Sequence, residues 1–193
     1  MNALFANFIT RVAFEYPLAP NYQVVQNYRE FFEALQYVES DRTYANYLKQ
    51  VPIDPYLNNK SSLMEWVEGM TGKIQVSADL SDNVWKYLFM ICASYPNLPS
   101  FQTILQYKNF FLKMENVFPS ILYRKQYVNQ MRYLPVDQYT SSRQLMMEWI
   151  TRMYQSMSET NTEYTIEKYT DYNSHAILIS AILIGCVFIY KLM

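Results

Sequence analysis

Apolar side chains recur along this chain at the three- and four-residue spacing of an amphipathic α-helix. Two stretches show the spacing most clearly, with apolar residues at i, i+3, i+4 and i+7. They are Tyr28, Phe31, Phe32 and Leu35 in the first half of the chain, and Tyr107, Phe110, Phe111 and Met114 in the second. The pattern predicts an all-α fold with helices at residues 3–15, 21–38, 42–49, 60–71, 82–94, 100–117, 120–131 and 141–157.

Prolines and hydroxyl side chains mark where these helices begin and end. The motif Tyr-Pro-x-x-Pro occurs at 16–20 and again at 95–99. Proline disfavours helical geometry in the residue before it and suits the first turn of a helix, so the motif ends one helix and starts the next. Thr and Ser at 140–142 precede an apolar periodic run, which predicts another helix start.

An uncharged apolar run at 176–190, which extends to residues 174–193, stands apart from the amphipathic segments. As a helix it would be about 30 Å long, enough to cross a bilayer, with Lys191 reaching the far head groups. Because the run is apolar all round, we expect a membrane span and not a buried core helix. Asn7 and Arg11 interrupt the first apolar stretch of the chain, so no signal peptide is predicted. The expected topology is single-pass and tail-anchored, with the body facing the cytosol.

The two halves of the chain resemble each other. Residues 15–38 align with 94–117 at an offset of 79 and share eight identities. Residues 51–70 align with 134–153 at an offset of 83 and share seven. Average composition would give about one or two identities in the first block. Since the order of the blocks is kept, the pattern predicts a tandem duplication with a four-residue insertion near Arg124–Arg132.

The duplication sets the expected domain boundaries. The predicted parts are a helical module at 1–78, a second module at 79–158, an acidic juxtamembrane stalk at 159–173 and the anchor at 174–193. In each module one tryptophan, Trp66 or Trp149, is expected to seal the same position of the core. Residues 1–78 carry 6 basic and 8 acidic side chains, whereas 79–158 carry 8 and 5.

Composition excludes several kinds of chemistry. Three glycines in 193 residues cannot build a phosphate-binding loop, and a net charge of −1 disfavours nucleic acid as a partner. Cys92, Cys186 and His175 are too few for a disulfide framework, a metal site or a Cys–His nucleophile. No metal and no catalytic group are therefore expected.

The stalk contains an acidic residue at every fourth position: Glu159, Glu163, Glu167 and Asp171. Like charges at this spacing oppose a helix slightly, which favours a solvated stalk. The alternative is a docking stripe for a basic partner.

Three stretches of the second half follow the spacing of a known motif set. They are "WKYLFMICASYP" at 85–96, "FFLKMENVFPSILYRKQY" at 110–127 and "WITRMYQSMS" at 149–158. They resemble the ERV/ALR family of FAD-linked sulfhydryl oxidases, with its Trp-x3-His-x2-Ala-x-x-Tyr-Pro, Pro-Cys-x-x-Cys and Trp-x4-His-Asn-x-x-Asn motifs. The matching residues are Trp85, Tyr95, Pro96, Pro119 and Trp149. The resemblance implies two four- or five-helix bundles that pair as a pseudodimer.

The positions that differ from the family are those that carry its chemistry. Ser120 and Tyr123 stand where the two cysteines would be, and Phe89 replaces the first histidine. The degenerate flavin positions are Trp85, Phe89, Tyr95, Trp149, Tyr154, Gln155 and Ser158. A serine hydroxyl cannot replace the thiolate that attacks a disulfide, so no oxidase activity is implied. Phe89 and Tyr154 are expected to fill the vacated cavity from inside, so no cofactor is expected.

These inferences favour a non-catalytic, membrane-anchored scaffold or adaptor. The resemblance implies a setting, because the family occurs in large DNA viruses that assemble around an internal membrane. A minor virion protein that links this membrane to the capsid is the expected role, with the bilayer and capsid or membrane proteins as partners. Two alternatives stay open: a residual flavoprotein that assists an active oxidase, and a tail-anchored Bcl-2-like regulator, whose hallmark Asn-Trp-Gly-Arg is absent here.

Overall fold

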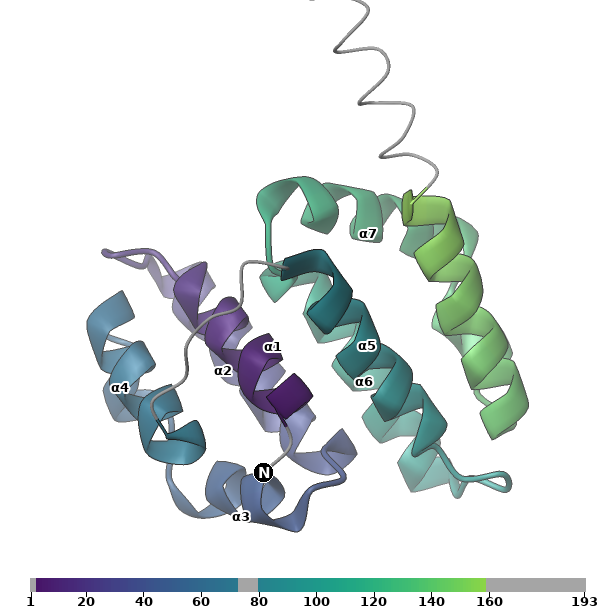
Figure 1. The fold of residues 1–193 in the computed structure, drawn as a ribbon, viewed down its shortest axis with the longest axis horizontal. Coiled ribbons are helices and arrows are strands. Elements are labelled where there is room, and N and C mark those ends of the chain that lie inside the picture. The colour runs from purple at the N-terminus through teal and green to yellow at the C-terminus, as the bar shows by residue number, and fades with distance from the viewer. Residues whose placement is uncertain (1–2, 73–79, 159–193) are drawn as a thin grey trace, which may run out of the picture. The chain divides into compact units, whose positions relative to one another are not determined.

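The computed structural model describes residues 3–72 and 80–158, and the regular structure within these ranges is entirely helical (Figure 1). The predicted all-α class is confirmed for this part of the chain. The chain divides into two units, Met1–Tyr154 and Gln155–Met193, and only residues 155–158 of the second unit belong to the described part.

The helices lie close to their predicted positions. In chain order they are α1 (Ala3–Phe14), α2 (Tyr22–Val38), α3 (Arg42–Gln50), the short 3-10 helix η1 (Asp54–Tyr56), α4 (Lys60–Thr71), α5 (Leu80–Ala93), α6 (Phe101–Val117), α7 (Ile121–Tyr133), the 3-10 helix η2 (Val136–Tyr139), and a last helix at 143–158. Side-chain caps determine where three of these helices begin. Asn21, Asn59 and Ser100 each accept a hydrogen bond from the backbone amide three residues later, which satisfies an N–H group that the helix leaves unpaired.

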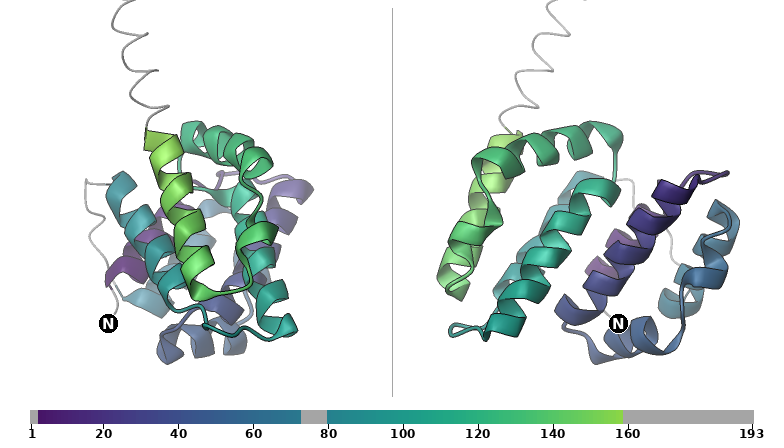
Figure 2. Two further views of the ribbon diagram at one scale, coloured as in Figure 1. Left: turned by 90° about the vertical axis from the view of Figure 1, so that its right-hand side faces the viewer. Right: turned by 180° about the vertical axis from the view of Figure 1, so that it is seen from behind.

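Four helices form the centre of the first unit. In Figure 1, α1 and α5 lie side by side, and the view from behind in Figure 2 shows the same relation for α2 and α6. The contact between α2 and α6 is the most extensive between any two labelled helices. The loops α1–α2 and α5–α6 lie at opposite ends of this layer (Figure 1). The central helices therefore bring the two halves of the sequence together.

The interior of the first unit is unusually aromatic. The largest fully buried side chains are Trp66, Trp149, Tyr16, Tyr44, Tyr87, Tyr95, Tyr127, Phe5, Phe8, Phe31, Phe110 and Phe111. The predicted burial of Trp66 and Trp149 is confirmed. Aromatic rings bury large apolar areas and pair edge to face, so they supply much of the packing energy of such a small core.

Within 3–72 and 80–158, no helix is both long and apolar enough to cross a bilayer. The predicted stalk at 159–173 and anchor at 174–193 lie outside the described residues, as do Cys186 and His175. The predicted boundary between the modules, at 78/79, also falls in a range that is not described.

Candidate functional site

The positions that align with the two cysteines of the ERV/ALR motif, Ser120 and Tyr123, lie at the N-terminus of α7. Ser120 is the N-cap residue, and its backbone has a φ of 77°, which is a left-handed conformation that L-residues rarely adopt. Its hydroxyl makes no cap hydrogen bond to α7. Tyr123 follows in the first turn of the same helix and is partly buried. Neither side chain supplies a thiol, so this end of α7 cannot exchange a disulfide.

The counterparts of these two positions in the first half are Asp41 and Tyr44, at the start of α3. Asp41 is a conventional N-cap residue, whose carboxylate accepts a hydrogen bond from the Thr43 amide at 2.9 Å. The ring of Tyr44 is buried and stacks on Phe5 with centroids 4.1 Å apart. Both residues therefore have structural roles.

Several of the predicted flavin positions come together beside the middle of α5. The ring of Tyr154 lies edge-on to Trp85 at 5.5 Å and to Phe89 at 5.9 Å, measured between centroids. The ring of Phe118 also lies against Trp85, with centroids 5.8 Å apart. The expectation that Tyr154 fills an interior cavity is wrong, because its side chain is 37% exposed and Phe89 is only partly buried. Instead, these rings cover the edge of the buried Trp85 at the surface.

The remaining flavin positions divide between the core and the surface. Tyr95 and Trp149 are buried, and each donates a hydrogen bond to a backbone carbonyl: Tyr95 to Thr140 at 2.6 Å and Trp149 to Leu134 at 2.9 Å. Gln155 and Ser158 are exposed on the last helix. Tyr95 and Trp149 therefore have structural roles, because each ties a helix to a distant backbone carbonyl.

The first half contains the same two hydrogen bonds. The Tyr16 hydroxyl donates to the Leu57 carbonyl at 2.7 Å, and the Trp66 indole N–H donates to the Val51 carbonyl at 3.3 Å. Tyr16 lies 79 positions before Tyr95, while the other three residues lie 83 positions before their counterparts. These are the two offsets of the aligned sequence blocks.

Other interactions recur with the same offsets. Arg29 forms an ion pair with Asp54, and Lys108 forms one with Asp137. The edge-on ring pairs Tyr16–Tyr28 and Tyr95–Tyr107 both have centroids 4.6 Å apart. Phe32 packs on Trp66 at 5.0 Å, and Phe111 packs on Trp149 at 4.5 Å. The shared residues of the two halves are thus those that hold the helices together.

A buried carboxylate links the two halves. Glu39, at the C-terminal end of α2, accepts a hydrogen bond from the Tyr87 hydroxyl of α5 at 2.6 Å and another from the Asp41 amide at 2.7 Å. Glu39 is only 7% exposed, and this burial raises the pKa of its carboxyl above the ordinary value. Burial also raises the pKa of Tyr87 far above its ordinary value, so Tyr87 keeps its proton and remains the donor.

The described residues offer little for thiol or metal chemistry. Cys92 is fully buried in α5, and burial raises the pKa of its thiol well above the usual value, which suppresses the reactive thiolate. Among residues 3–72 and 80–158, no three His, Cys, Asp or Glu side chains cluster as a metal site. Within the described ranges, the Cys92 thiol is therefore withheld from solvent.

Sequence reasoning missed two features. The burial of Glu39 has no local signal, because the residue follows an amphipathic helix and precedes a polar turn. A pocket of about 350 Å³ between α6 and α7 was also missed, since its charged lining reads as a solvated helix face. The cluster of basic residues on α7 was the available signal for it.

Comparison of the chain with protein-family models, with curated proteins and with solved structures returned no match.

Proposed function

We propose that this protein is a non-catalytic, membrane-anchored helical scaffold or adaptor. Its body is inferred to be a tandem duplication of an ERV/ALR-like bundle, whose two copies pair as a pseudodimer within one chain. The proposal depends on one observation above all: the same contacts recur in both halves, around positions that hold no reactive thiol.

The recurring contacts support the duplication independently of sequence identity. The donor pairs Tyr16/Tyr95 and Trp66/Trp149 reach carbonyls that are themselves related by the alignment offset. The ion pair Arg29–Asp54 recurs in the second half as Lys108–Asp137, although lysine replaces the arginine. Two unrelated bundles have no physical reason to share these particular long-range interactions.

The absence of an enzymatic role is inferred from the residues at the former redox positions. Ser120 and Tyr123 cannot form a disulfide, and the one described thiol, Cys92, is enclosed in the core. Attack on a disulfide requires an accessible thiolate.

The membrane role is inferred from the apolar run at 174–193, which has the length and composition of a bilayer span. The finer proposal is a minor structural protein of a large DNA virus, which links an inner membrane to the capsid. In this setting the acidic stripe of Glu159, Glu163, Glu167 and Asp171 would meet a basic partner.

Membrane extraction tests the proposed function. The full chain, expressed in cells, is expected to stay in the membrane pellet through high-salt and alkaline carbonate washes and to be released by detergent. A variant that lacks residues 174–193 is expected in the supernatant. Release of the full chain by salt alone would contradict the proposed anchor. If the viral setting is right, the protein is also expected to copurify with virus particles that are isolated without detergent.

A further inference from the structure

We propose that the outer face of α7, with the groove that it forms against α6, binds an acidic peptide segment of a partner protein. The proposal rests on the adaptor role proposed above and deepens it, because it states the chemistry of one partner.

One side of α7 carries a group of basic residues. The helix carries Arg124, Lys125 and Arg132 and contains no acidic residue. Positions i, i+1 and i+8 lie within one side of an α-helix, so the three cations share a face. The buried residues Tyr127 and Met131 lie on the adjoining side of the helix, next to Arg124. The cationic face therefore borders the core at the partly buried Arg124 and is exposed at Lys125 and Arg132.

None of these three cations forms an ion pair with a carboxylate of the described ranges, although the charge of Arg132 acts on the Glu115 carboxyl. Elsewhere, basic residues pair with carboxylates, as in Arg11–Glu15, Arg29–Asp54, Lys108–Asp137, Lys113–Glu30 and Arg152–Glu148. In the described ranges, neither Lys125 nor Arg132 forms an ion pair, and Arg124 instead donates its Nε–H to the Phe118 carbonyl at 3.2 Å. That bond fixes the guanidinium stem beside the groove.

The start of α7 also lacks the negative charge that a helix N-terminus favours. Its first turn has no acidic residue, and Ser120 gives no side-chain cap. The equivalent helix of the first half, α3, begins at the carboxylate of Asp41. A carboxylate from a bound segment would complement both the helix end and the cations beside it.

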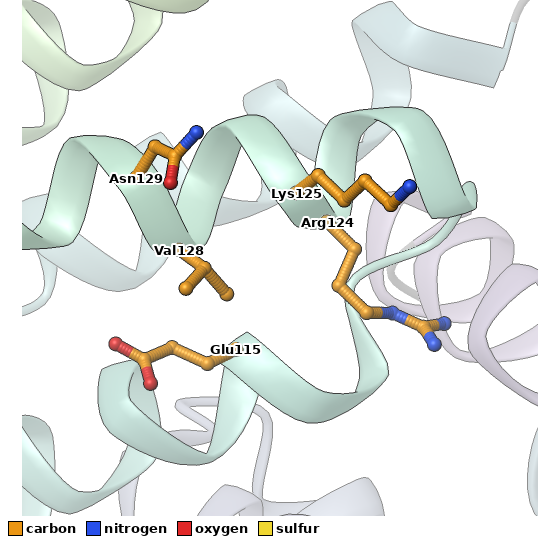
Figure 3. A pocket seen from close by; sticks show the side chains of 5 residues that line it. All are labelled: Glu115, Arg124, Lys125, Val128 and Asn129. Carbon is orange, nitrogen blue, oxygen red and sulfur yellow. The ribbon is translucent and has the colours of Figure 1, made fainter.

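The shape and lining of the groove favour a peptide over other anions. The groove has a volume of about 350 Å³, and Figure 3 shows Glu115 of α6 facing Val128, with Arg124 and Lys125 toward the N-terminal end of α7. Val128 offers an apolar contact that a polyphosphate chain cannot use, and a bound segment would place its carboxylates beside Arg124 and Lys125, away from the like charge of Glu115. A partner segment with carboxylates next to an apolar side chain fits this lining best.

The test uses the full chain in mild detergent and a fluorescent peptide of repeating Asp-Leu-Glu, with a repeating Asn-Leu-Gln peptide as control. We expect the acidic peptide alone to bind, and added salt to weaken it. In the variant Lys125→Glu/Arg132→Glu, which changes two exposed side chains, affinity is expected to fall at least about tenfold. The matched change on α3, Arg42→Glu/Lys49→Glu, is expected to alter affinity by less than about twofold.

Equal binding by both double variants, or no binding of the acidic peptide, would overturn the proposal. So would a single-stranded oligonucleotide or phosphatidylserine in mixed micelles that binds through Lys125 and Arg132 while the peptide does not. Circular dichroism of each variant controls for folding. Because this assay runs in detergent, it is independent of the extraction test, so failure of the membrane anchor and failure of the α7 surface are seen separately.

Discussion

The rings of Phe31 and Phe110 meet across the contact between α2 and α6, with their centroids 6.0 Å apart. The two residues are 79 positions apart, which is the offset of the first aligned block. Phe8 and Tyr87, separated by the same offset, stack at 4.4 Å. A residue that touches its own counterpart lies next to the axis that relates two copies. In the proposed pseudodimer, the axis thus passes through this aromatic centre.

Truncation at the axis is expected to weaken both halves together. Phe31→Ala and Phe110→Ala each remove a fully buried ring, and each is expected to lower the free energy of unfolding by about 3–5 kcal/mol. Denaturant unfolding followed by circular dichroism measures the loss, and a single transition is expected in every case. Phe101→Ala, at a side chain that is 76% exposed, is the matched control and is expected to cost less than about 0.5 kcal/mol. Separate transitions for the two halves would contradict the shared core.

The two buried tyrosine donors are expected to contribute equally. Tyr16→Phe and Tyr95→Phe keep the ring and leave the Leu57 or Thr140 carbonyl without this donor. Each is expected to cost about 1–2 kcal/mol of unfolding free energy. Tyr22→Phe, at an exposed position of α2, is expected to cost nothing measurable. A large cost at one tyrosine and none at the other would count against equivalent roles.

The buried Glu39 predicts a pH dependence of stability. Its carboxyl has a raised pKa in the folded state, so the folded protein holds this proton more tightly than the unfolded chain. The resulting stabilisation is complete below the unfolded value of 4.5 and is lost as the pH rises through the folded pKa. Glu39→Gln removes this titration and can still pair with Tyr87. As the pH increases, the unfolding free energy of this variant is therefore expected to rise relative to that of the wild type.

Unfolding curves at several pH values check this expectation, with Glu33→Gln on the exposed face of α2 as control. If the difference in unfolding free energy between the wild type and the Glu39→Gln variant stays constant with pH, the assignment is refuted. Glu39→Leu, which leaves the buried Tyr87 hydroxyl without this acceptor, is expected to cost about 1–3 kcal/mol.

The Cys92 thiol is expected to be unreactive while the protein is folded. Full burial and a raised pKa both withhold the thiolate from solvent. In the variant Cys186→Ser, a maleimide probe should label Cys92 only as fast as the protein unfolds, and denaturant should make labelling immediate. Rapid labelling of the native protein would show an accessible thiol and would reopen thiol chemistry.

The helices were predictable because their signals are local. Apolar spacing and the Tyr-Pro-x-x-Pro motif placed helices at 21–38 and 100–117, and the structure has Tyr22–Val38 and Phe101–Val117. The 3-10 helices η1 and η2 were missed. Each is a single turn at or next to a proline, and one turn is too short to show a hydrophobic period.

The site could be predicted only in part because tertiary contacts decide it. The equivalence of Trp66 and Trp149 followed from the repeat, and both are buried. The exposure of Tyr154 did not follow, because helical spacing does not reveal how far a neighbouring element covers a ring. The left-handed backbone of Ser120 and the pairing of Glu39 with Tyr87 likewise depend on residues distant in sequence.

The absorption spectrum of the purified full chain tests the central claim most directly. If two sequential copies of a redox bundle have lost their chemistry and kept their shape, protein from flavin-replete cells, before and after incubation with FAD and gel filtration, shows only the near-ultraviolet band of tryptophan and tyrosine. A stoichiometric flavin band in the visible range that survives gel filtration would contradict the account.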